Sequence, residues 1–147
     1  MIDYQYHTRK GYFQKLDGAV LLNGSPVPVF DTFAVNGAEY PYIILSTQTA
    51  VDDSVKRCQG QEVTMLLDVV TGFTGAVQRI PLDTICNQIY QLINPVDGTG
   101  FIDVVPDLQV ISTRLLSDTT MEGQNDVWKI VRRLIRFGHK IHEQVTL

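Results

Sequence analysis

Three segments in the first half of the chain have the composition of β-strands, and they constrain the fold more than any other feature. They are Val-Pro-Val-Phe-Asp at 27–31, Glu-Tyr-Pro-Tyr-Ile-Ile-Leu-Ser at 39–46 and Gln-Glu-Val-Thr-Met-Leu-Leu-Asp-Val-Val-Thr at 61–71. β-branched and aromatic residues, which favour strands, dominate them. Pro26 and Pro28 each remove a backbone donor, so the first segment is predicted at a sheet edge or paired only through its second half. The segments carry no nucleophile, metal cluster or phosphate loop.

The rest of the chain supplies two helices and further strands. Residues 3–16 predict a helix with Asp3 as N-cap, in which Tyr6, Tyr12 (or Phe13) and Leu16 share a face. Gly11 weakens this helix by about 1 kcal/mol relative to alanine. The clearest helix is at 81–93, where apolar residues recur near the 3.6-residue period. It is expected to end at Asn94-Pro95, before a loop that reaches Gly100.

A strand is predicted from Leu108 to Leu116, followed by a polar link to Asp126. The segment 127–137 fits either a helix or a strand, and its β-branched and aromatic content favours a strand. The residues at 47–60 are predicted to form a long polar loop, and 138–147 a flexible polar tail. The resulting order, α-β-β-β-α-β-β, predicts an α+β fold: a mainly antiparallel sheet with one or two helices packed on one face.

Composition limits the classes of function. The 147 residues suit one domain, and 44% of them are hydrophobic, which excludes a disordered chain. The net charge of −4 argues against a protein that reads nucleic-acid sequence, because such proteins are normally basic. No apolar run approaches the ~20 residues that span a bilayer, so no membrane contact is expected. Residues 1–10 are polar, which predicts no signal peptide.

No combination of residues predicts a reaction. His139 and His142 have the spacing of two ligands on a helix, but the sequence supplies no evident third ligand, so no metal and no cofactor are expected. No histidine is placed to activate a serine or threonine near Asp52 and Asp53. Cys58 and Cys86 lack a CxxC spacing and are expected to be unpaired thiols, with Cys86 in the core. The sequence therefore predicts a protein that is not an enzyme.

The order and spacing of these segments resemble the phage tail completion, or tail terminator, proteins. The matching pieces are Val27–Asp31, Tyr40–Leu45, the polar loop through Lys56-Arg57-Cys58, the strand from Glu62 to Val70, the helix at 81–93, and the final strand Trp128–Phe137. The resemblance implies a virion structural protein assembled in the host cytoplasm. It would form a homo-oligomeric ring of six or twelve copies at the head–tail junction. Its partners would be connector or neck proteins and tail proteins, with genomic DNA passing through the channel without sequence-specific binding.

Two groups of residues are candidates for these contacts. Acids that could line the channel and keep DNA from adhering are Asp52, Asp53, Glu62 and Asp68, although they could equally be ordinary solvated acids. Candidates for a subunit interface are Trp128, Arg132, Arg133 and Arg136. The arginines could instead form the solvated face of an edge strand, and Trp128 could be a core anchor. The alternative function is a non-catalytic cytosolic binding module or assembly chaperone for tail or neck components.

Overall fold

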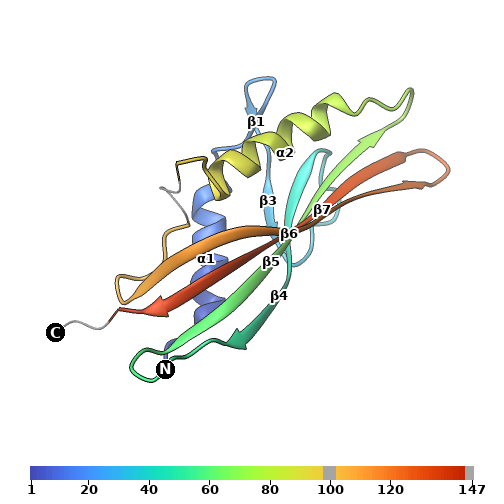
Figure 1. Cartoon of the computed structure of the whole chain (residues 1–147). Helices are drawn as coiled ribbons and strands as arrows, with labels where there is room; N and C mark the ends of the chain where they lie inside the picture. Colours follow the sequence, from blue (N-terminus) through green and yellow to red (C-terminus); the bar gives the residue numbers. More distant parts are fainter. Residues whose placement is uncertain (98–101, 145–147) are drawn as a thin grey trace.

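The computed structural model describes residues 1–97 and 102–144, and the fold is a mixed sheet with helices on one face (Figure 1). The elements follow in the order α1 (Tyr4–Leu16), β1 (Leu21–Leu22), β2 (Ser25–Pro26), β3 (Val29–Asp31), β4 (Tyr42–Asp52), β5 (Gly60–Phe73), α2 (Ile80–Ile93), β6 (Leu108–Gln124) and β7 (Lys129–Glu143). The main sheet has five strands in the order β3-β4-β5-β7-β6, and all its pairs are antiparallel except β3 with β4. The predicted α+β class and element order are confirmed.

The edge position predicted for the first strand is confirmed. β3 pairs with β4 only through Val29–Asp31, after the two prolines, and no strand of the described chain lies on its other side. The pairing is parallel because the chain returns through residues 32–41 before β4 begins. Asn23 and Gly24 form the turn that joins β1 to β2, and both residues have positive φ angles, 51° and 80°.

Three polar segments extend the strands beyond the sequence prediction, which is therefore wrong there. Residues 47–52 belong to β4, 117–124 belong to β6, and 138–143 belong to β7; residues 145–147 of the expected tail lie outside the described residues. The predicted 47–60 loop shrinks to a short turn between β4 and β5. The physical reason is backbone pairing: β7 pairs with β5 on one side and β6 on the other, and Gln48–Asp52 of β4 pair with β5. The ladder therefore orders polar residues that bury little. The loop after α2 is described only to Asp97, and residues 98–101 lie outside the described part.

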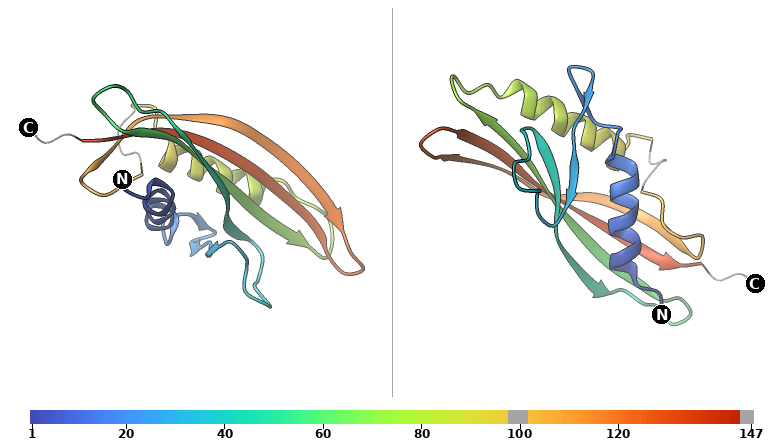
Figure 2. Two further views of the ribbon diagram at one scale, coloured as in Figure 1. Left: turned by 90° about the horizontal axis from the view of Figure 1, so that it is seen from below. Right: turned by 180° about the vertical axis from the view of Figure 1, so that it is seen from behind.

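The core lies between the sheet and the two helices, which cover the same face (Figure 2). α2 buries Ile85, Cys86, Ile89 and Ile93 of its predicted apolar face and also Leu82, whereas Ile80, which the periodicity placed on that face, is 77% exposed. Burial raises the pKa of the Cys86 thiol to about 12, in keeping with an inert core residue. Neither helix of the described chain is long and apolar enough to cross a membrane.

α1 uses a different face from the one predicted. Asp3 caps it, accepting a hydrogen bond from the Tyr6 backbone at 3.1 Å, and Tyr12 and Leu16 are buried as expected. Tyr6, however, is 57% exposed, while Tyr4 and Gly11 face the core. The reason is that Gly11 lets the backbone of Asp103 approach the helix, which a side chain at this position would prevent: a Cβ there would lie 2.5 Å from the Asp103 carbonyl oxygen.

Replacing Gly11 tests whether helix propensity or packing determines how a side chain at this position changes stability. Propensity alone predicts that Gly11→Ala stabilises the protein by about 1 kcal/mol. We expect instead a loss of about 1–3 kcal/mol, because a backbone carbonyl must move. Urea unfolding of the wild type and the variant gives the sign of the change in the free energy of unfolding. Gly75→Ala is the matched control, since a Cβ at Gly75 meets nothing within 4 Å, and a stabilised Gly11→Ala variant would contradict the close contact.

Candidate interaction surfaces

The strand alternation gives the main sheet two unlike faces. One packs against α1 and α2. On the other, here called the helix-free face, the register aligns Tyr42 with Val70 and Arg132, and Ile44 with Asp68 and Leu134. Neither helix covers this second face (Figure 2), so charged side chains can meet solvent or a partner there.

An ion pair lies in the middle of the helix-free face. Arg132 on β7 binds Asp68 on β5 through two hydrogen bonds, Nε to Oδ1 at 3.1 Å and Nη2 to Oδ2 at 2.6 Å. The side chain of Asp68 is only 12% exposed and that of Arg132 40% exposed. The hydrogen bonding from Asp68 raises the pKa of the guanidinium. Asp68 is thus neutralised by a bidentate partner rather than presented as a free acid.

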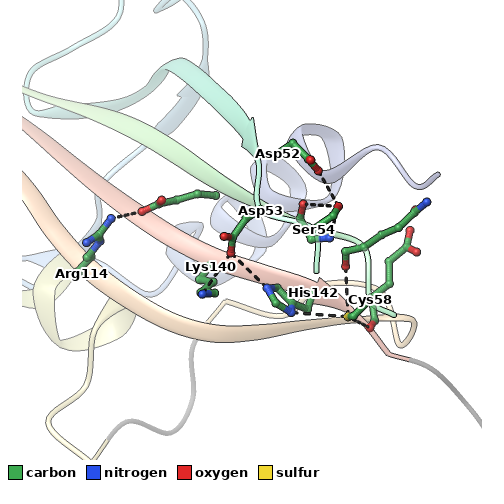
Figure 3. Close-up of polar contacts among 11 residues, drawn as sticks. Asp52, Asp53, Ser54, Cys58, Arg114, Lys140 and His142 are labelled. Carbon is green, nitrogen blue, oxygen red and sulfur yellow. Dashed lines mark hydrogen bonds and ion pairs between the residues drawn. The ribbon is translucent and has the colours of Figure 1, made fainter. Parts of the chain in front are cut away.

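Two of the other candidate acids are also paired, at the end of the sheet where β4 turns into β5 (Figure 3). Glu62 forms an ion pair with Arg114 of β6. Asp53 lies 3.3 Å from both Lys140 Nζ and His142 Nε2. Hydrogen bonds from His142 and then Lys140 lower the pKa of the Asp53 carboxyl.

Asp52 is the candidate acid that forms no ion pair with the described residues. Its carboxylate accepts a hydrogen bond from the Ser54 hydroxyl at 2.6 Å, and the residue is exposed. Three of the four candidate acids therefore have a cationic partner on the sheet. Their role at a channel wall stays a prediction, but the wall they would form carries less negative charge than the acids alone suggest.

The interface candidates on β7 do not share a face. Arg132 and Arg136 project from the helix-free face, whereas Arg133 lies on the helix side, where it binds Asp118 of β6 and Asp83 of α2. Strand alternation separates them, because residues one position apart point to opposite faces. Arg136 donates to the hydroxyls of Thr64 and Thr47, at 3.2 and 3.4 Å, and pairs with no carboxylate of the described residues.

Trp128 lies at the β6–β7 turn and is partly buried within its own chain. Its ring packs against Tyr40 with centroids 5.0 Å apart, and Tyr40 stacks on Tyr42 at 5.5 Å. Tyr40 in turn covers Gly72, where a Cβ would lie 2.5 Å from the ring. Trp128 therefore fixes the hairpin turn to the segment before β4, and any role at a subunit interface stays a prediction.

The sequence did not predict the surroundings of the C-terminal histidines. His142 has Cys58 Sγ 3.6 Å from its Nδ1, and this thiol also lies 3.3 Å from the backbone oxygen of Glu143 (Figure 3). Within residues 1–97 and 102–144, no group of three or more His, Cys, Asp or Glu side chains could hold a metal ion.

His139, expected in a flexible tail, is fully buried between α1 and β6. Its Nε2 contacts the Tyr12 hydroxyl, and its Nδ1 lies 2.8 Å from Thr113 Oγ1. Burial raises the pKa of Tyr12 well above its usual value, so the phenol keeps its proton and donates a hydrogen bond to Nε2. Nδ1 then carries the imidazole proton and donates to Thr113. Burial lowers the pKa of His139 to about 4, so the ring is neutral at pH 7.

Comparison with known proteins identifies the fold. A chain in the solved structure of the virion of a native gene transfer agent (GTA) particle superposes with a TM-score of 0.71. The match covers 95% of this chain and 99% of the other, at 15% sequence identity. The two chains share a fold. No protein-family profile matches the sequence, and no curated protein does.

Asp68 and Arg132 should contribute more stability than the exposed pair on the same face. We expect Arg132→Gln to lower the free energy of unfolding by about 2–3 kcal/mol, because it leaves the Asp68 carboxylate nearly buried without its partner. Arg114→Gln is the matched control: its pair with Glu62 is exposed, and the expected loss is below about 1 kcal/mol. Equal losses in urea unfolding would contradict the difference in burial.

His139 should make the protein less stable in mild acid. Its folded pKa of about 4 lies below its ordinary value of 6.5, so the unfolded chain takes up the proton first as the pH falls. Stability from this group is complete above about pH 6.5 and decreases toward pH 4, by about 2 kcal/mol between pH 7 and pH 5. Urea unfolding at several pH values measures the slope.

His139→Gln separates this effect from other titrating groups. Glutamine keeps a donor and an acceptor but has no proton to gain in this range. The variant should be less stable at pH 7 and should lose about 2 kcal/mol less than the wild type between pH 7 and pH 5. Parallel pH curves for the two proteins would show that His139 is not the group responsible.

Proposed function

We propose that this protein is a structural component of a tailed virion and forms a ring at the head–tail junction, around the channel through which DNA passes. The observation that carries the proposal is the fold shared, over nearly the whole of both chains, with a component of a native GTA virion. The segment order that resembles the tail completion and tail terminator proteins supports the finer assignment to the neck.

The open edges of the main sheet support assembly from identical subunits. β6 lies at one edge with no strand partner on its outer side within the described chain, and β4 extends past β3 at the other edge through residues 46–52. β6 runs antiparallel to both β3 and β4, so a neighbour in the same orientation could add its edge to β6. A contact between two different edges is heterologous, and such contacts form a ring where the rotation between neighbours closes.

Irregularities in the pairing of β6 with β7 limit which part of β6 can pair with a neighbouring subunit. The register of β6 against β7 shifts between Val110 and Ser112 and again between Leu115 and Ser117. Bulges of this kind interrupt edge pairing. The regular stretch is Ser117–Gln124, a polar run without proline, and this is where we place the contact with the neighbouring sheet.

The helix-free face suits the wall of a DNA channel. Asp68 is neutralised by Arg132 and Glu62 by Arg114, so the face has charge of both signs and no cluster of free lysines or arginines. Phosphates bind tightly only where several cations can displace counterions. Of the two arginines of β7 on this face, only Arg136 has no carboxylate partner among the described residues, and its guanidinium is held by threonines. DNA could therefore pass such a wall without adhering to it.

A measurement of assembled mass tests the proposal. Native mass spectrometry and negative-stain microscopy of the purified protein at high concentration should show closed rings, of six or twelve copies if the tail-terminator resemblance holds. The protein should also be present in purified particles at a fixed ratio to the tail subunits. A protein that stays monomeric or dimeric and is absent from purified particles would instead be an assembly chaperone or binding module, and the proposal would be wrong.

A further inference from the structure

A projecting loop after β3 exposes apolar side chains at one edge of the sheet. This loop, residues 32–39, is called the finger. Phe33 is 80% exposed and Val35 is 61% exposed. Figure 2 shows the finger leaving the body of the molecule beside β4, on the side of the sheet away from β6.

The finger has a defined backbone. The amide of Thr32 donates to Leu45 O at 2.9 Å, and that of Ala38 donates to Val35 O at 3.1 Å. Gly37 has a φ of 78°, a conformation that its missing side chain permits and that closes the turn. Two apolar side chains on an ordered, projecting turn are typical of a surface that meets a partner.

A groove lies at one end of the sheet, between the strand ends of β6 and β7 and the loop that leads into α2. Its volume is about 580 Å³. The residues that line it include the apolar Val77, Ile130 and Val131 and the cationic Arg79 and Lys129. Glu122 of β6 also lines it, so the groove reaches the edge strand.

The charges of the finger and the groove are complementary. Glu39, at the base of the finger, is exposed and forms no ion pair with the described residues, and the same holds for Lys129 in the groove. β4, beside the finger, and β6, which lines the groove, are separated by β5 and β7. Phe33 of the finger is 80% exposed, so the finger does not fill the groove of its own chain.

We propose that the finger of one copy docks into the groove of the next, with Phe33 against the apolar lining of the groove and Glu39 facing Lys129. This docking rests on the proposed ring of subunits and specifies one of the contacts within it. The occupant of the groove is a second copy of this chain, because that copy carries both the apolar tip and the opposite charge. The contact joins unlike surfaces, so every copy contributes one finger and one groove, and the chain of contacts continues until it closes.

A charge exchange between two variants tests this pairing. Glu39→Lys places two lysines together in every contact, and Lys129→Glu places two glutamates together, so each variant alone should associate roughly tenfold or more weakly than the wild type. Mixed in equal amounts, the two variants should assemble again. Each contact in an alternating ring then joins a lysine to a glutamate, whichever copy supplies the finger.

A separate variant tests the apolar part of the contact. Phe33→Ser removes the exposed ring without touching the core and should also weaken association roughly tenfold or more. Val55→Ser and Lys56→Glu are matched controls, since both residues are exposed in the turn between β4 and β5 and should leave assembly unchanged. Analytical ultracentrifugation over a range of concentrations gives the association constants, and urea unfolding verifies that each variant is folded.

The outcomes separate this contact from the ring itself. If the wild type assembles and Phe33→Ser or the single charge variants assemble equally well, the finger does not dock in the groove, while the ring remains supported. If the mixture of charge variants fails to recover, Glu39 and Lys129 do not face each other. If the wild type is monomeric at its highest soluble concentration, both this contact and the proposed ring are wrong.

Discussion

The hydrogen-bonded ladder between β5 and β7 is the constraint on which the rest of the structure depends. It pairs the two strands without a register shift from Gly60 and His142 at one end to Phe73 and Lys129 at the other. On the helix side, its alternate residues form the floor of the core against which α1 and α2 pack. On the other side, the same alternation holds Asp68 beside Arg132 and fixes the polar character of the helix-free face. β4 and β6 attach to the outer edges of this pair, so both faces and both edges of the sheet take their positions from it.

Apolar periodicity predicted the parts of the fold that bury side chains. The helix at 81–93 and the strand at 61–71 have a clear period because one face of each meets the core, and the prolines at 26 and 28 correctly indicated an edge. The polar ends of β4, β6 and β7 have no such period. Their order comes from backbone pairing with a neighbouring strand, a long-range effect that composition does not report. A run such as Ser-Asp-Thr-Thr-Met-Glu at 117–122 can be a loop or a polar strand until its partner is known.

The candidate surfaces were predicted in part, for a similar reason. The sequence identified the basic residues of β7, but their division between two faces follows from strand alternation: Arg132 and Arg136 share one face, and Arg133 takes the other. Once the segment was taken as a strand, this division could have been predicted. The partners of Asp53 and Asp68 could not, because Lys140 and Arg132 come from distant sequence positions that only the strand register brings close. The buried contact of His139 with Tyr12 likewise depends on how α1 crosses the sheet.

The exposed length of β6 is difficult to explain for an isolated subunit. From Arg114 to Gln124 every residue is classed as exposed, although the side chain of Asp118 is only 21% exposed, so this part of the strand buries little and depends on β7 for its order. Edge strands of soluble monomers are usually short or protected by lysine and proline, and Ser117–Gln124 has neither. A neighbouring subunit that covers this edge would remove the risk of aggregation that an open edge strand carries. The finger follows the edge strand β3, and the edge strand β6 lines part of the groove, so both lie where a neighbour's sheet would meet this one. A polar edge strand can pair with its neighbour in more than one register. The phenyl ring of Phe33 can enter the groove in only one position, so it does not allow this shift. The finger would therefore fix the register between neighbouring subunits, while the paired edge strands would supply most of the contact area.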